Sequence, residues 1–187
     1  MSITFPTILT LLRIVMIPVL VLAFYLPYDG SNELAVGIFI AAGATDWADG
    51  WIARRYGLTS PFGAFLDPVA DKLIVAVALI LIIQRHPEIL LAISAAVIMG
   101  REITISALRE WMAELGQRAR VKVSHVGKSK TVFQMVAIGF LLYGDSLWGI
   151  PVLRIGEALL VVAAVLTIWS MIIYLRSAWP AIRSESS

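Results

Sequence analysis

The most informative part of this chain is a pair of short stretches, Asp46-Trp-Ala-Asp-Gly-Trp-Ile-Ala-Arg54 and Gly63-Ala-Phe-Leu-Asp-Pro-Val-Ala-Asp71. Each stretch carries two aspartates at the end of a segment that is otherwise apolar enough to cross a membrane. A lone ionised Asp near the centre of a spanning helix costs about 2.5 to 3.5 kcal/mol on insertion scales. Four acids in such segments therefore indicate a compensating positive charge, most simply bound metal.

The composition excludes an ordinary soluble domain. Of 187 residues, 59% are hydrophobic and 15% are charged, and the mean hydropathy is +0.86, which lies outside the usual balance of soluble proteins. A spanning helix takes about 20 residues, so we expect one membrane domain over residues 1–187, with the function in the helices or their short loops. The chain has no cysteine, which excludes thiol catalysis and thiolate metal sites.

Apolar runs separated by Pro, Gly and charged residues predict an all-α integral membrane protein with six transmembrane helices. The expected spans are 6–26, 34–54, 64–84, 88–112, 127–144 and 152–176. Because proline removes a backbone donor, Pro18 should bend the first of them. The first segment is therefore predicted to be an N-terminal interfacial segment followed by a true span.

Basic residues concentrate in alternate loops and at the C-terminus. They are Arg54, Arg55, Arg118, Arg120, Lys122, Lys128, Lys130, Arg176 and Arg183. Cytoplasmic loops carry the excess of Lys and Arg, so both termini and the four acids are expected on the cytoplasmic side. No Arg- and Ser-rich leader is present, and we expect a multi-pass protein of the bacterial inner (plasma) membrane whose active site faces the cytoplasm.

The spacing of the acids predicts a metal site. Asp46 and Asp49 are three residues apart and Asp67 and Asp71 are four apart, so each pair shares one helix face. A tight loop between the two helices can turn these faces toward each other. Carboxylate oxygens suit Mg²⁺ or Mn²⁺, and four acids can hold two such ions in a clamp suited to phosphoryl transfer.

The residues around the acids fit a phosphate-bearing ligand. Gly50 and Gly63 remove side chains where a ligand can approach the backbone, and Arg54 lies one turn after Gly50, where it can meet a phosphate. The alternative is that the acids are only solvated or form salt bridges to Arg54 and Arg55.

The pattern Asp-x-x-Asp-Gly-x-x-Ala-Arg, eight residues, Gly-x-x-x-Asp-x-x-x-Asp resembles the signature of the CDP-alcohol phosphotransferases, and every fixed position is present. The resemblance implies a six-helix membrane enzyme, usually a homodimer, with a polar cavity open to the cytoplasm. It implies that Asp46, Asp49 and Asp67 hold one ion. Asp46, Asp67 and Asp71 would hold the second ion, with Asp71 as the catalytic base.

The same resemblance implies a binding site for the CDP-diacylglycerol donor. Its residues would be Thr7, Thr10, Gly50, Arg54, Ser60 and Gly63. Relatives contact the nucleotide through an Asn-x-x-Thr-x-x-Arg stretch, which reads Thr7-Ile-Leu-Thr-Leu-Leu-Arg13 here. Thr therefore replaces Asn at the first position, and its hydroxyl can still form a hydrogen bond.

A second cluster of charges points to the acceptor. Arg101 and Arg109 lie inside the fourth expected span, and Lys128 and Lys130 stand at the start of the fifth. An embedded Arg is costly, which favours a ligand or an acid partner, and several cations suit a second phosphate. The alternative for the two lysines is that they only set the topology.

The stretches Gly100-Arg-Glu-Ile-Thr-Ile-Ser-Ala-Leu-Arg109 and Gly127-Lys-Ser-Lys-Thr-Val-Phe-Gln134 resemble the branch of this family that makes phosphatidylglycerol phosphate. The resemblance covers essentially the whole chain. It implies transfer of the phosphatidyl group from CDP-diacylglycerol to sn-glycerol 3-phosphate, with release of CMP. The acceptor phosphate would lie among Arg101, Arg109, Lys128 and Lys130.

Three alternatives remain open. A sibling enzyme would use serine, inositol phosphate or phosphatidylglycerol as acceptor, but an acceptor without phosphate leaves the basic cluster unexplained. A divalent-cation transporter would place its acids near mid-membrane, with access from both sides. A structural membrane subunit gives no reason for four embedded acids. Membrane lipids are expected around the protein, and no nucleic-acid partner is expected.

Overall fold

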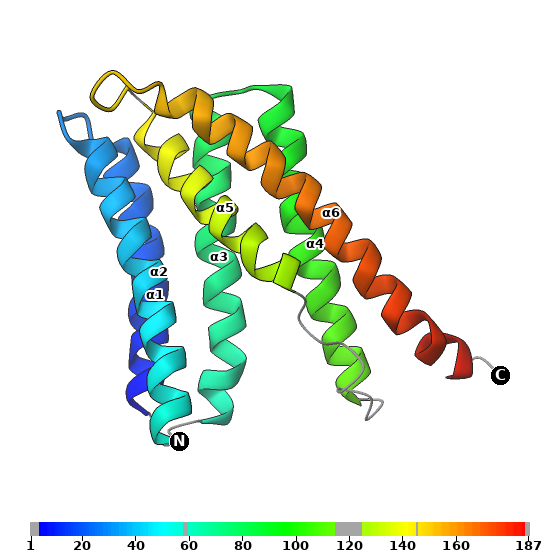
Figure 1. Cartoon of the computed structure of the whole chain (residues 1–187). Helices are drawn as coiled ribbons and strands as arrows, with labels where there is room; N and C mark the ends of the chain where they lie inside the picture. The colour runs from blue at the N-terminus through cyan, green and yellow to red at the C-terminus, as the bar shows by residue number, and fades with distance from the viewer. Residues whose placement is uncertain (1–3, 58–59, 115–124, 145, 186–187) are drawn as a thin grey trace. The chain divides into compact units, whose positions relative to one another are not determined.

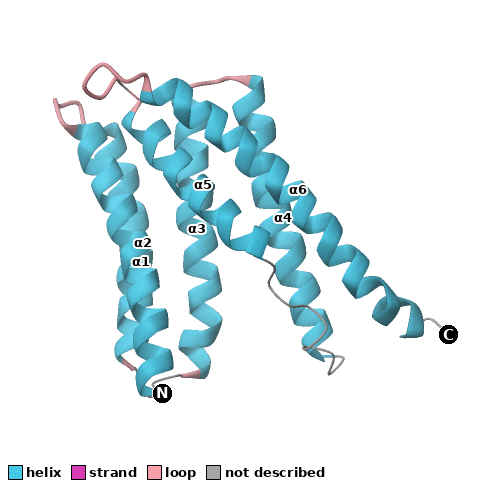
Figure 2. Ribbon diagram, viewed as in Figure 1, coloured by secondary structure: helices cyan, strands magenta, loops and turns pink. Residues whose placement is uncertain are grey.

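The structure is a computed structural model that describes residues 4–57, 60–114, 125–144 and 146–185. Within these ranges the chain forms six helices and no strand (Figure 1, Figure 2). The helices are α1 Phe5–Tyr25, α2 Ser31–Tyr56, α3 Pro61–Arg85, α4 Ile89–Glu114, α5 His125–Tyr143 and α6 Val152–Glu185. The predicted all-α fold is confirmed, and each helix overlaps one of the six expected spans.

Three of these helices are long and apolar enough to cross a membrane by themselves. They are Phe5–Tyr25 of α1, Ile89–Met112 of α4 and Val152–Arg176 of α6. The apolar part of α5, Lys130–Tyr143, is shorter, and α2 and α3 carry the acids. The number of six transmembrane helices therefore stays a prediction. Within the described residues, three helices have the length and hydropathy of membrane spans.

The first helix runs through Pro18 without interruption, because α1 spans Phe5–Tyr25 as one helix. The expected interfacial segment and the expected span therefore belong to one helix, which packs against both α2 and α3. A proline removes one backbone hydrogen bond, and the bend expected at Pro18 stays a prediction.

The chain divides into two compact units, which are described separately. The first comprises Met1–Pro87 and Ile138–Arg154, and the second comprises Glu88–Ala137 and Ile155–Ser187. In the first unit α1 packs against α2 and α3, around the buried side chains of Leu20, Phe39 and Leu79. The expectation of one domain over residues 1–187 stays a prediction.

The connection between α2 and α3 brings two helix ends together in the first unit. Gly57 follows α2 with a φ of 64°, in the left-handed region that glycine adopts at least cost. Ser60 caps α3 by accepting a hydrogen bond of 3.0 Å from the Gly63 amide, and Pro61 occupies the first helical position. The end of α2 and the start of α3, which carry the acids, are thereby joined by a short link.

The opposite end of the first unit is tied together by Arg85. Its Nη1 donates to Asn32 Oδ1 at 2.6 Å and to the Leu142 carbonyl at 3.3 Å, and its Nη2 donates to the Phe24 carbonyl at 3.3 Å. The guanidinium also lies 3.8 Å from the Phe24 ring centroid. Cations stabilise the exposed carbonyls of helix C-termini, so one arginine completes the ends of α1 and α5.

In the second unit α6 packs on α4. Ile105, Leu108 and Met112 of α4 form a buried cluster with Tyr174 of α6. Ile105, Leu108 and Met112 follow helical spacing, which turns one face of α4 toward α6. The same stretch of α4 carries Arg101 and Arg109.

Candidate active site

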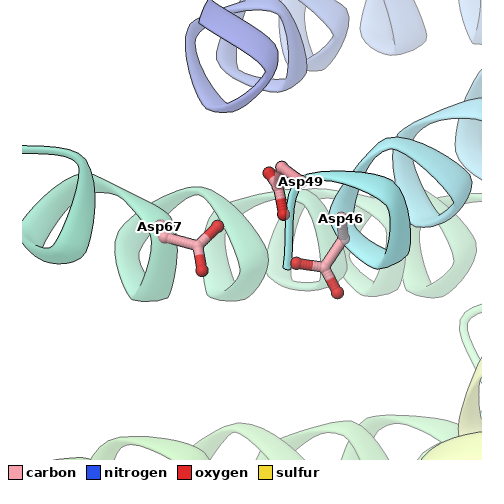
Figure 3. Close-up of side chains that lie close together, drawn as sticks. All are labelled: Asp46, Asp49 and Asp67. Atoms are coloured by element: carbon pink, nitrogen blue, oxygen red, sulfur yellow. The ribbon is translucent and has the colours of Figure 1, made fainter. Parts of the chain in front are cut away.

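Three aspartates from two helices converge at the α2–α3 end of the first unit. One carboxylate oxygen from each of Asp46, Asp49 and Asp67 lies within 4.8 Å of the others (Figure 3). Asp46 and Asp49 come from α2 and Asp67 comes from α3, which is the convergence that the helical spacing predicted. Such a cluster of carboxylates has the donor set of a site for a hard divalent cation.

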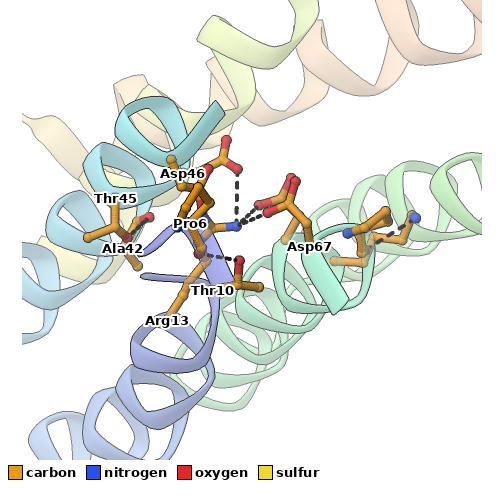
Figure 4. Close-up of polar contacts among 11 residues, drawn as sticks. Pro6, Thr10, Arg13, Ala42, Thr45, Asp46 and Asp67 are labelled. Atoms are coloured by element: carbon orange, nitrogen blue, oxygen red, sulfur yellow. Dashed lines mark hydrogen bonds and ion pairs between the residues drawn. The ribbon is translucent and has the colours of Figure 1, made fainter. Parts of the chain in front are cut away.

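The cation that these acids surround in the structure is Arg13 of α1 (Figure 4). Its Nη1 lies 3.0 Å from an oxygen of Asp46, 3.1 Å from Asp67 and 2.7 Å from Asp71. Its Nη2 lies 2.6 Å from Asp49. All four predicted acids therefore meet at one guanidinium, and Asp71 belongs to the same cluster.

Burial separates Asp49 from the other three acids. The Asp49 side chain is 4% exposed, whereas those of Asp46, Asp67 and Asp71 are 41%, 42% and 45% exposed. One guanidinium does not neutralise four carboxylates, so the cluster has a net negative charge. Three of its four carboxylate side chains are accessible to solvent. These residues fit a divalent cation in both charge and ligand type.

Arg13 is one site residue that the sequence analysis did not name. It appeared there only as the last residue of the stretch that relatives use to contact the nucleotide. The signal was present, because an arginine in the middle of an apolar helix needs a partner. Only the packing of α1 between α2 and α3 shows that the partners are the four aspartates.

A pocket of about 170 Å³ opens next to the acids. Its lining comes from the start of α1, the end of α2 and the start of α3: Thr4, Pro6, Thr7, Thr10, Asp49, Gly50, Ser60, Gly63, Ala64 and Asp67. Five of the six residues expected to bind the donor therefore line one pocket. The sixth is Arg54, whose side chain lies outside the described part of the structure.

Hydroxyl groups line this pocket in a fixed arrangement. The Thr7 and Ser60 hydroxyls lie 3.0 Å apart, and Thr10 donates to the Pro6 carbonyl at 3.1 Å. A Cβ added to Gly63 would lie 2.8 Å from Thr7 Oγ1 and 3.0 Å from Ser60 Oγ. Gly63 is therefore required for the close approach of α3 to α1.

The residues expected at the acceptor lie in the second unit. Arg101 pairs with Glu102 at 3.1 Å, and Lys130 pairs with the same carboxylate. Arg109 donates to the Tyr174 hydroxyl at 2.7 Å. The side chain of Lys128 lies outside the described residues. The structure thus joins Arg101 and Lys130 through Glu102, which the sequence analysis had not named as a site residue.

Arg101 is held from two sides. Its Nη2 donates to the Ser170 hydroxyl of α6 at 3.4 Å, while Glu102 contacts its Nη1. Its Nε is buried and has no hydrogen-bond partner among the described residues. A buried donor without an acceptor is uncommon in folded proteins, so a ligand or water is expected to supply one.

Comparison with known proteins identifies the family of this chain. The CDP-alcohol phosphatidyltransferase family matches residues 3–169. The chain is 50% identical to a Pseudomonas fluorescens protein over 181 residues, which is 96% of this chain and 92% of that protein. It is 51% identical over 178 residues to proteins of Escherichia coli K12 and Shigella flexneri serotype 5b, covering 95% of this chain and 96% of each.

All three relatives are named CDP-diacylglycerol--glycerol-3-phosphate 3-phosphatidyltransferase. The family match spans most of the chain, including all four acids and both groups of predicted binding residues. The chain therefore belongs to the CDP-alcohol phosphatidyltransferase family.

Proposed function

We propose that the protein transfers the phosphatidyl group of CDP-diacylglycerol to sn-glycerol 3-phosphate, giving phosphatidylglycerol phosphate and CMP. The observation that carries this is the identity of about half the residues, over nearly the whole chain, to relatives named for that reaction. The convergence of Asp46, Asp49, Asp67 and Asp71 on one cation site supports it.

The donor binds in the pocket between α1, α2 and α3. Thr7, Thr10 and Ser60 offer hydroxyl groups there, and Gly50 and Gly63 leave room beside the backbone. Arg54 is assigned to the same ligand on the spacing of the motif. The pocket adjoins Asp49 and Asp67, so a nucleotide in it has its pyrophosphate near the acids.

Two Mg²⁺ or Mn²⁺ ions would be held by the acids. Asp46, Asp49 and Asp67 would hold one ion, and Asp46, Asp67 and Asp71 would hold the other. The charge excess around Arg13 and the oxygen donors support this assignment. When bound, the two ions would neutralise the negative charge of the donor's pyrophosphate.

Asp71 is the base. It takes the proton of the acceptor hydroxyl, and the oxygen then attacks the phosphorus that carries diacylglycerol, so that a P–O bond to the acceptor forms while the bond to CMP breaks. The exposure of the Asp71 carboxylate, unlike that of Asp49, supports access by a substrate. No covalent intermediate with the enzyme is needed.

The acceptor phosphate binds to Arg101, Arg109, Lys128 and Lys130. Arginine and lysine are the side chains that form charged hydrogen bonds with phosphate. Three of these residues are joined to Glu102 or Tyr174 in the second unit, which supports one ordered group.

The protein works as a homodimer in the bacterial inner membrane, with this chemistry on the cytoplasmic side.

A panel of acceptors tests the function. Purified protein is incubated with CDP-diacylglycerol, Mg²⁺ and one alcohol at a time, and CMP release is measured. We expect turnover with sn-glycerol 3-phosphate and little with serine, inositol phosphate, phosphatidylglycerol or glycerol. Preferred turnover with another of these alcohols would reassign the protein to a sibling activity, and absence of CMP release with every one would refute the enzyme assignment.

A further inference from the structure

Tyr174 of α6 is buried beside two arginines of α4. It is 3% exposed. The Arg109 guanidinium carbon lies 5.3 Å from the ring centroid, and that of Arg101 lies 5.6 Å from it. Both distances are within the range of attraction between a cation and an aromatic face. One ring therefore serves two guanidinium groups that stand eight residues apart on α4.

The Tyr174 hydroxyl adds a directional contact. It accepts a hydrogen bond of 2.7 Å from Arg109 Nη2. Ser170, one turn earlier on the same face of α6, accepts from Arg101 Nη2 at 3.4 Å. The face of α6 that meets α4 thus supplies one oxygen acceptor to each arginine, and these hydrogen bonds restrain the position of both side chains.

The charges of this group are unbalanced. Glu102 pairs with Arg101 and Lys130, and no carboxylate pairs with Arg109 among the residues that the structure describes. Three cations against one carboxylate leave two positive charges uncompensated, which matches a phosphate monoester near neutral pH. The two guanidinium groups repel each other. The neutral ring and hydroxyl of Tyr174 can hold them in position without cancelling the positive charge that would attract a phosphate.

We propose that Tyr174 is a positioning residue of the acceptor-phosphate site, and that it acts by fixing Arg109 and Arg101 in the geometry that receives the phosphate. The inference rests on the proposed function, because it takes the acceptor to be a phosphorylated alcohol. It adds α6 to a site whose sequence motifs lie on α4 and α5. An arginine whose rotamer is already fixed loses less conformational entropy when it binds an anion.

The test is a kinetic comparison of Tyr174→Phe with the unmodified full-length protein. Phe keeps the ring that packs on Ile105, Leu108 and Met112, and it removes only the hydroxyl that holds Arg109. We expect a roughly tenfold rise in the KM for sn-glycerol 3-phosphate. The KM for CDP-diacylglycerol and the melting temperature should stay unchanged.

Tyr25→Phe is the matched control. The Tyr25 hydroxyl donates to Gln84 in the first unit, and neither residue is among the predicted binding residues. Removing it takes away a tyrosine hydroxyl with a polar partner but should leave both KM values as they are.

A double variant shows whether the effect passes through Arg109. In an Arg109→Ala background, Tyr174→Phe should raise the KM for sn-glycerol 3-phosphate little further, because the guanidinium that it positions is gone. Two effects that multiply would overturn the positioning role, and so would equal losses for both substrates or a fall in kcat with both KM values unchanged.

The outcomes separate this inference from the proposed function. If the unmodified protein uses glycerol as well as sn-glycerol 3-phosphate, the proposed function fails in its acceptor, whatever Tyr174→Phe does. If the unmodified protein requires the phosphorylated acceptor and Tyr174→Phe keeps the same KM for it, the function stands and the role of Tyr174 is wrong.

Discussion

Arg13 Nη2 lies 2.6 Å from the Asp49 carboxylate, and the two side chains are 0% and 4% exposed. This buried ion pair joins α1 to α2, and the other guanidinium nitrogen contacts Asp67 and Asp71 of α3. Three helices are thus joined by one side chain. Breaking a buried pair by removing one partner costs about 3 to 5 kcal/mol, because the other charge is left without compensation.

Arg13→Met should therefore lower the melting temperature of the purified protein in a metal chelator by several degrees. Added Mn²⁺ should recover more stability in this variant than in the unmodified protein, because the ion replaces the lost positive charge among the acids. Arg13→Lys keeps the positive charge, so its melting temperature should lie between those of Arg13→Met and the unmodified protein. The control is Arg55→Met, which removes an exposed arginine near the end of α2. Equal melting temperatures for Arg13→Met and Arg55→Met would contradict the role of the ion pair.

Each acid of the cluster should be needed for turnover. Asp46→Asn, Asp49→Asn, Asp67→Asn and Asp71→Asn should each lose most CMP release while still inserting into the membrane and folding, because each removes a charged oxygen ligand. Calorimetric titration with Mn²⁺ should show two ions for the unmodified protein. Asp29→Asn changes an exposed acid outside the cluster and should retain both activity and two ions. Near-normal activity at saturating metal in the Asp46, Asp67 or Asp71 variant would show that the two-ion assignment is wrong.

Gly63→Ala should impair donor binding. The added methyl group would stand 2.8 Å from Thr7 Oγ1, so the start of α3 or the Thr7 side chain must move within the pocket. Overpacking of this kind costs about 1 to 3 kcal/mol, and we expect a roughly tenfold higher KM for CDP-diacylglycerol. Gly37→Ala is the control, because a Cβ there meets no atom within 4 Å. A Gly63→Ala enzyme with unchanged KM would show that this close approach is not needed.

Lys130→Ala should weaken binding of the acceptor much more than that of the donor. A lost hydrogen bond to a charged group is worth roughly 1.5 to 3 kcal/mol, so the KM for sn-glycerol 3-phosphate should rise about tenfold or more. Arg154→Ala removes an exposed arginine outside the second unit and serves as the comparison. If the two variants behave alike, Lys130 contributes only to topology or to its pairing with Glu102.

Transfer should invert the configuration at phosphorus. A single displacement with Asp71 as base inverts the centre once, whereas a covalent phosphatidyl-enzyme would require two displacements and retain it. The measurement uses CDP-diacylglycerol made chiral at the transferred phosphorus, followed by stereochemical analysis of the product. Retention, or a lipid-labelled enzyme trapped before the acceptor is added, would contradict the role given to Asp71.

The sequence by itself determined the helices and the acids. Apolar runs of spanning length predicted all six helices, because burial of apolar side chains follows a period that can be read along the chain. The spacing of Asp46 with Asp49 and of Asp67 with Asp71 predicted two acidic helix faces for the same reason. The helix α1 is continuous through Pro18, and the bend expected there stays a prediction.

Only the tertiary structure decided which side chains meet. It placed Arg13 among the four acids, Glu102 between Arg101 and Lys130, and Tyr174 against two arginines. Each of these contacts joins side chains from different helices, apart from the neighbouring pair Arg101 and Glu102. Sequence spacing fixes directions within one helix but not the rotation of one helix against another. That rotation is set by the packing of whole helix faces, which no short motif contains.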